Sequence, residues 1–168
     1  MRISENTLHL AGFALAHAAW SVSDLSAGDL LCPLAFVEEA GERKLLRFEA
    51  ASQEQAIGNA LATLDEKRLL GNSWAFVREG VVRKGEEELD VLVAMVWAPG
   101  MAEPLCFTQP FEPFAKRGTF RVLGKLEVVN VEGSTEGHDM IAEIVREGIF
   151  QHSKVAPLWP QWEATDAA

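Results

Sequence analysis

The sequence has no tyrosine and only two cysteines, and its basic residues are outnumbered by its acidic ones, 15 against 25. Its formal net charge is −10 and its isoelectric point about 4.8. Proteins bind nucleic acid largely through Lys and Arg side chains that displace counterions from phosphates, so this charge argues against a nucleic-acid-binding protein. An anionic membrane surface would repel the chain for the same reason. A basic protein partner, by contrast, would be attracted.

A long uninterrupted hydrophobic run is also missing. A membrane span needs roughly 18–20 consecutive apolar residues, and the apolar N-terminal stretch is interrupted by His9 and His17. No convincing signal-peptide cleavage site follows it, so we interpret this stretch as a helix of the mature fold. Neither Cys32 nor Cys106 belongs to a CxxC or CxxH pattern, and the sequence leaves open whether they lie close in space. We expect a protein of a bacterial-type cytoplasm, with reduced thiols and no membrane association.

The motifs that mark common active sites are absent as well. The chain contains no P-loop and no dinucleotide-binding GxGxxG pattern. Residues 133–137 resemble the GxSxG nucleophile motif, but Ser134 directly follows the first glycine, so the spacing fails. His9 and His17 would lie about 12 Å apart along a helix, too far to ligate one metal ion. We therefore predict no catalytic residue, no metal site and no cofactor.

The periodicity of the apolar residues indicates an α+β fold. With 168 residues, 48% of them hydrophobic, the chain fits one domain. Helical patterns predict helices near both ends and in between, and alternating or continuous apolar runs predict the strands. The expected helices cover residues 4–24, 52–68 and 135–150, and the expected strands cover 30–37, 44–49, 74–83, 89–98, 105–108 and 119–131. Short turns between successive strands require antiparallel pairing. The prediction is a four- to six-stranded, mainly antiparallel sheet with about three helices, in the order α-β-β-α-β-β-β-β-α.

Three of these elements have distinctive composition. The first helix is apolar around most of its circumference, so we expect it to be buried on more than one face. The strand over 89–98 is apolar on both faces, which places it centrally in the sheet. The strand over 105–108 is crowded by Pro104, Pro110 and Pro113, so we expect it at an edge or irregular.

Two segments are typical of interaction surfaces. Residues 99–114 contain four prolines and three phenylalanines, and prolines stiffen a loop and lower the entropy cost of docking. Residues 153–168 lack periodicity, so we separate them from the domain of residues 1–152 as a partly flexible tail, ordered only where a tryptophan finds a surface. Tryptophans are frequent anchors at interfaces. Both segments could equally fold back over the sheet. The hypothetical interaction surface consists of Met101, Phe107, Phe111, Phe114, Trp159 and Trp162.

One candidate polar site combines His138, Asp139 and Cys106. A histidine near a helix N-terminus is pushed toward its neutral form, which suits a base or a ligand. Ordinary helix-start composition explains the same residues equally well, and Cys106 would contribute only if the fold brought it to His138. His152 follows the last predicted helix, where a positive charge is favourable.

The leading functional hypothesis is a non-catalytic, acidic, inhibitor-like interaction protein with a basic partner, present as a homodimer. It depends on the missing motifs, the net charge and the apolar segments. One alternative is a small-molecule binding module with a pocket between the sheet and the first helix, walled by Trp20, Trp74 or Trp97. The other is an enzyme whose site is assembled without a sequence motif.

Overall fold

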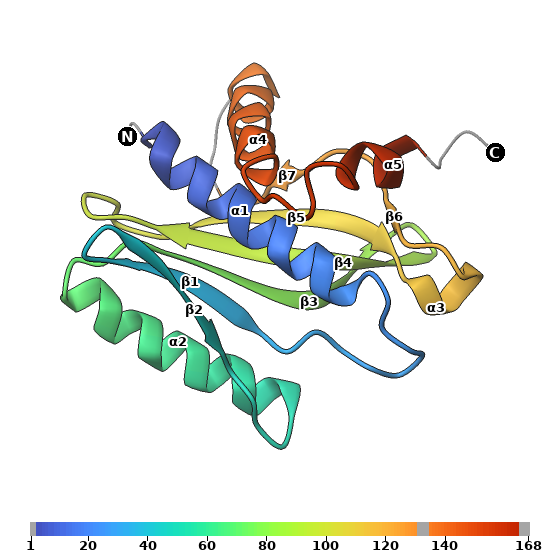
Figure 1. Cartoon of the computed structure of the whole chain (residues 1–168), viewed down its shortest axis with the longest axis horizontal. Coiled ribbons are helices and arrows are strands. Elements are labelled where there is room, and N and C mark those ends of the chain that lie inside the picture. Colours follow the sequence, from blue (N-terminus) through green and yellow to red (C-terminus); the bar gives the residue numbers. More distant parts are fainter. Residues whose placement is uncertain (1–2, 131–134, 165–168) are drawn as a thin grey trace.

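Seven strands paired antiparallel form one sheet, with helices on both of its faces (Figure 1). The computed structural model describes residues 3–130 and 135–164. The helices are α1 (Glu5–Val22), α2 (Gln53–Leu69), α3 (Phe114–Arg117), α4 (Thr135–Ile149) and α5 (Trp159–Ala164). The strands are β1 (Leu34–Glu39), β2 (Glu42–Arg47), β3 (Trp74–Lys84), β4 (Glu87–Trp97), β5 (Leu105–Glu112), β6 (Arg121–Val122) and β7 (Glu127–Val128). Their order is β2-β1-β3-β4-β5-β6, with β7 also paired to β5, so the predicted α+β class is confirmed and β4 is an interior strand.

Helix α1 is the centre of one layer. It begins where the Ser4 hydroxyl accepts a hydrogen bond from the Thr7 N–H at 3.2 Å, which satisfies a helix-end donor. It packs against β3 and β4 and is crossed by α4 (Figure 1). At the crossing, a Cβ atom added to Gly12 would lie 2.8 Å from the backbone nitrogen of Ile149, and one added to Gly148 would lie 2.6 Å from the Cα of His9. The prediction that this helix is buried on more than one face is confirmed.

Helix α2 covers part of the opposite face of the sheet (Figure 1). Its capping residue, Ser52, accepts a hydrogen bond from the Gln55 N–H at 3.1 Å, as the capping pattern in the sequence indicates. Near its other end, the ammonium of Lys67 lies 2.7 Å from the Glu39 carboxylate of β1, and the guanidinium of Arg68 lies over the Trp97 ring of β4. The hydrophobic core includes Ala60 and Leu64 of α2 as well as residues of α1, α4 and α5.

Strand β5 was expected at an edge or irregular, and the structure places it inside the sheet. It pairs with β4 on one side and with β6 and β7 on the other. The Pro110 carbonyl accepts a hydrogen bond from the Leu123 N–H at 2.9 Å. The N–H and C=O of a strand residue point to the same side, so the N–H that Pro110 lacks would point away from β4, toward β6 and β7. The proline therefore removes no hydrogen bond between β5 and β4.

The predicted strand over 119–131 is interrupted. It forms β6 and β7, separated by a turn in which Gly124 has a φ of +63°, a conformation that favours glycine. The amide of Gln109 donates to the Leu123 carbonyl at 3.2 Å and so holds this turn against β5. Phe120 and Val122 are buried, while residue 131 of the predicted strand lies outside the described part of the chain.

The segment predicted as a tail is packed against the domain as far as Glu163. Trp159 and Trp162 are 2% and 9% exposed, and the Trp162 ring meets Phe120 edge-on at 4.8 Å between centroids. An ion pair of 2.6 Å joins Glu163 to Arg146 of α4. Both tryptophans thus pack against the domain, and this part of the expected tail belongs to the core. Residues 165–168 lie outside the described residues.

Candidate functional site

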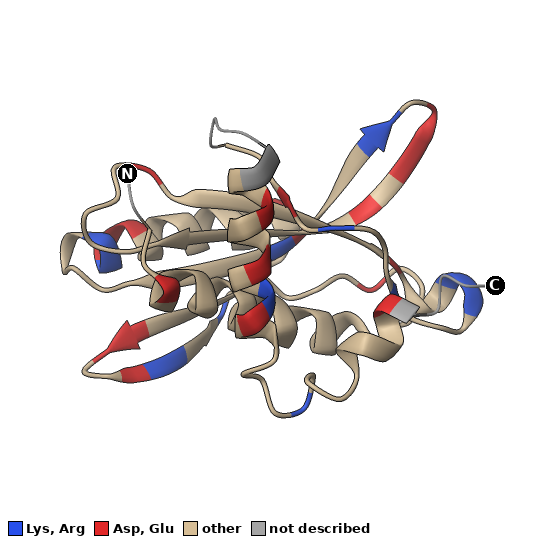
Figure 2. Cartoon of the chain, turned by 90° about the horizontal axis from the view of Figure 1, so that it is seen from above, with Lys and Arg blue, Asp and Glu red and all other residues tan. Residues whose placement is uncertain are grey.

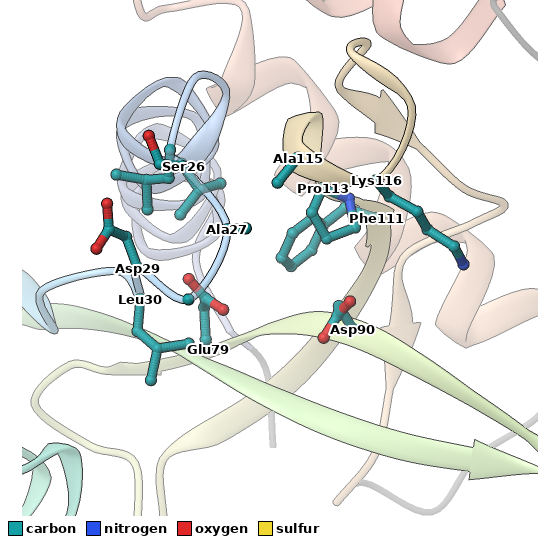
Figure 3. Close-up of a pocket in the computed structure, with 13 residues that line it drawn as sticks. Ser26, Ala27, Asp29, Leu30, Glu79, Asp90, Phe111, Pro113, Ala115 and Lys116 are labelled. Atoms are coloured by element: carbon teal, nitrogen blue, oxygen red, sulfur yellow. The ribbon is translucent and has the colours of Figure 1, made fainter.

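A pocket of about 460 Å³ lies between the sheet, the end of α1 and helix α3 (Figure 3). It is lined by Val22, Leu25, Ser26, Ala27, Gly28, Asp29, Leu30, Glu79, Asp90, Phe111, Pro113, Ala115 and Lys116. Its volume falls in the range of about 300–1,000 Å³ that small-molecule sites occupy. Its position agrees with the small-molecule hypothesis, but Trp20, Trp74 and Trp97 are not among its lining residues.

The wall formed by the α1–β1 connection is fixed by hydrogen bonds at Leu31. Gly28, with a φ of +86°, turns the chain after α1. The Leu31 N–H then donates to the Glu79 carboxylate at 2.6 Å, and the Leu31 carbonyl accepts from the Gln53 amide at 2.7 Å. Because both polar groups of this peptide region are bound, the connection is held against β3 and α2.

The polar groups of the pocket floor are two carboxylates on neighbouring strands. Glu79 of β3 lies opposite Leu92, and Asp90 of β4 lies opposite Val81. The two carboxylates are therefore diagonal neighbours on one face, roughly 7–8 Å apart at the backbone. Burial raises the pKa of Glu79, and the negative charge of Asp90 raises it further, while the Leu31 N–H acts in the opposite direction.

Neither carboxylate has an ion-pair partner among the described residues. Lys116, on α3, contributes the one ammonium of the lining and extends away from Glu79 (Figure 3). A half-buried carboxylate without a cation costs stability, because desolvation is not offset by attraction. The apolar walls, including Leu25 and Phe111, make the pocket complementary to a cation carried on an apolar body.

The structure does not bring the predicted polar site together. His138 and Asp139 lie in the first turns of α4, on the face of the sheet that α1 covers. Cys106 lies opposite Met95, and its two neighbours on β5 are buried on the α1 face, so by strand alternation its side chain is on the other face. Burial raises the pKa of the Cys106 thiol, although the charge of Arg78 acts against this, so the reactive thiolate is disfavoured.

Five residues of the predicted interaction surface are buried. The exposed fractions are 8% for Met101, 0% for Phe107, 4% for Phe111, 2% for Trp159 and 9% for Trp162. Phe107 and Phe111 are buried because half of the segment 99–114 is strand β5, and Trp159 and Trp162 are buried because the tail carries α5. Phe114, at 41%, is exposed. Most of the apolar residues on which the expected homodimer depended are thus buried within a single chain. The homodimer stays a prediction.

Glu79 and Asp90 were not among the predicted site residues, although the sequence holds a signal for both. Glu79 continues an apolar strand, and Asp90 precedes the apolar run of β4. Strand alternation puts each on the same face as buried neighbours, namely Val77 and Leu92. A charged residue at an inward-facing strand position is therefore the sequence pattern that indicates these two site residues.

No family model, curated protein or solved structure matches the chain. Within the described residues, no helix is long and apolar enough to cross a membrane, and no three His, Cys, Asp or Glu side chains are grouped to hold a metal ion. The function has to be inferred from the geometry of the chain itself.

Proposed function

We propose that this chain is a non-catalytic binding protein whose ligand places a positively charged nitrogen between Glu79 and Asp90. The observation that carries this proposal is that Glu79 and Asp90 have no ion-pair partner among the described residues. The pocket lining adds a third carboxylate, Asp29, and one ammonium, Lys116, and is otherwise largely apolar. A bound ammonium or guanidinium would supply the missing charge, because charge-assisted hydrogen bonds to carboxylates are strong.

The rest of the ligand would occupy the apolar part of the pocket. Leu25, Leu30 and Phe111 offer apolar surface, whose burial contributes about 25 cal/mol per Å². The net charge of −10 raises the local concentration of cations around the protein. A primary amine on an aromatic or aliphatic body combines both properties.

A thermal-shift comparison of phenethylamine with phenethyl alcohol tests the proposal. The two probes share a ring and a chain and differ in charge. A ligand at ten times its dissociation constant adds about 1.4 kcal/mol to the free energy of unfolding, which raises the Tm by about 3–6 °C in a protein of this size. We expect this rise with the amine and not with the alcohol. Equal shifts with both probes would refute a role for charge.

Matched variants locate the effect. Glu79→Gln and Asp90→Asn keep the shape of the side chains and remove their charges, and glutamine can still accept the hydrogen bond from Leu31. Glu87→Gln is the control, because Glu87 is exposed in the same β3–β4 hairpin and does not line the pocket. We expect the response to the amine to fall in the first two variants and to persist in the control. A full response in both pocket variants would contradict the assignment of this site.

A basic protein partner is the second candidate, favoured by the distribution of acidic residues. Asp139, Glu143 and Glu147 follow one another along α4 and are exposed (Figure 2). Such a partner could also insert a Lys or Arg side chain into the pocket. This candidate predicts that a protein captured at low salt is lost with Asp139→Asn, Glu143→Gln and Glu147→Gln but retained with Glu87→Gln.

A further inference from the structure

A second pocket, of about 290 Å³, lies beside α1 where the chain leaves α4. It is lined by Phe13, His17, Trp20, Gln151, His152, Ser153 and Lys154. We call it the His17–His152 pocket. It shares no lining residue with the Glu79–Asp90 pocket, so its properties can be considered independently of the proposed function.

Two imidazoles form its polar wall. The Nδ1 of His17 and the Nε2 of His152 are 3.1 Å apart, so one ring donates its proton to the other. The remaining ring nitrogens, His17 Nε2 and His152 Nδ1, are buried without a hydrogen-bond partner among the described residues. His152 itself is 6% exposed. Buried polar atoms without a partner are exceptions in folded proteins, and both of these atoms belong to residues that line the pocket.

Cations gather around this wall. The ammonium of Lys154 lies 4.6 Å from the centroid of the Trp20 ring, and the guanidinium of Arg43 lies 4.8 Å from that of Phe13. The charges of Arg47 and Lys154 both reach His17. Neither Arg47 nor Lys154 has an ion-pair partner among the described residues, while Arg43 lies 4.0 Å from Glu38.

The surroundings select the charge of the ligand. Two nitrogens 3.1 Å apart could share a metal ion, since zinc–nitrogen bonds are about 2.0–2.1 Å long. The described residues provide no third ligand of the usual kind, and Arg47 and Lys154 would repel a metal cation. An anion, in contrast, would be attracted by both side chains and would accept a hydrogen bond from a ring N–H of the histidine pair.

We propose that the His17–His152 pocket binds a small aromatic carboxylate. The carboxylate would lie between Lys154 and the histidine pair, and the ring would lie against Trp20 and Phe13. Flat side chains of this kind offer large apolar contact areas and prefer offset or edge-on arrangements with another ring. The volume of the pocket restricts the ligand to about one ring.

Nuclear magnetic resonance of the histidine ring nitrogens tests the proposal, with benzoate as the probe. The affinity of a ligand is limited by its number of non-hydrogen atoms, so we expect a small probe such as benzoate to bind in the millimolar range. Benzoate should shift the ring signals of His17 and His152 while those of His9 and His138 stay in place. Benzyl alcohol, which lacks the charge, and inorganic phosphate, which lacks the ring, should both bind much more weakly. No shift at saturating benzoate, or equal binding of either comparison compound, would overturn the proposal.

One charge variant and one control complete the test. Lys154→Gln removes a cation of the pocket lining that has no ion pair, and it should weaken benzoate binding about tenfold, which corresponds to about 1.4 kcal/mol. Lys44→Gln, on the same strand as Arg47, removes a cation that pairs with Glu39 on the α2 face, and it should leave the affinity unchanged. An equal loss in Lys44→Gln would mean that net charge alone governs the affinity, which would refute a built site.

Discussion

The crossing of α1 and α4 gives the sharpest test of the architecture. In Gly12→Ala, the new Cβ would lie 2.8 Å from the backbone nitrogen of Ile149 and would overlap the backbone carbonyl of Val145. Backbone atoms cannot change rotamer to make room, so the two helices would have to separate. Gly148→Ala creates the same conflict from the other helix, at 2.6 Å from the His9 Cα.

Opposing contributions set the size of the effect. Alanine in place of glycine favours a helix by about 1 kcal/mol. Overpacking costs about 1–3 kcal/mol or more, and the upper end applies here because the neighbours are backbone atoms and because Val145 and Ile149 are almost fully buried at the crossing. We expect a net loss of about 2 kcal/mol or more in the free energy of unfolding, which corresponds to a Tm lower by about 4–8 °C.

Urea unfolding followed by circular dichroism measures this loss, and Gly58→Ala is the matched control. Gly58 lies inside α2 with nothing within 4 Å of an added Cβ, so the same substitution should stabilise the protein by up to about 1 kcal/mol. Opposite signs for Gly12→Ala and Gly58→Ala would support the close crossing. A stabilising Gly12→Ala would refute it, because the alanine could then be accommodated without separating the helices.

Three further predictions follow from buried or half-buried groups. Glu79→Gln should raise stability at neutral pH, because the pKa of Glu79 is raised by burial and then by Asp90. The stability of the wild type should therefore fall as the pH rises from about 4.5 through the folded-state pKa. The free energy of unfolding of the variant, measured in urea, should depend less on pH over the same range. The pKa of His17 is lowered by burial, then by His152, Arg47 and Lys154, from 6.5 to about 4. As the pH falls, the unfolded chain takes up this proton before the folded protein does, so stability should fall as the pH is lowered from 6.5 to about 4. We expect a loss on the order of 1 kcal/mol after allowance for solvent screening of the partly exposed ring, and His17→Gln should remove this part of the slope. Trp159→Ala should cost about 3–5 kcal/mol in chemical unfolding, since it empties a core position; a loss below 1 kcal/mol would mean that α5 is not part of the core.

The elements that could be predicted from the sequence are those with local causes. The serine caps at Ser4 and Ser52 and the apolar periodicity after them are sufficient to place α1 and α2 within one or two residues. Strand β4 was central in the prediction because it is apolar on both faces. In β5, however, the effect of Pro110 depends on which side of the strand its nitrogen faces, and that is set by pairing with distant residues.

The two sites differ in how visible they are in the sequence. Glu79 and Asp90 are detectable once the strands are placed, because alternation then shows two charges facing inward. The His17–His152 contact joins residues separated by 135 positions, and no local sequence pattern predicts it. His152 was expected to carry a favourable positive charge at a helix end; it is instead 6% exposed with a lowered pKa, chiefly through burial, so it is neutral where the pair forms.

Helix α1 contributes to both pockets, and this sets an expectation for how they interact. Val22 lines the Glu79–Asp90 pocket, while Phe13, His17 and Trp20 line the His17–His152 pocket. A ligand in one pocket could change the affinity of the other only by moving α1, and any such change must be equal in both directions. The Gly12–Gly148 crossing holds α1 against α4 by backbone contact, and close-packed backbones resist small displacements. The affinity for benzoate should therefore stay within a factor of about two when phenethylamine is saturating. A larger change, abolished by Glu79→Gln, would show that α1 moves when the first pocket fills.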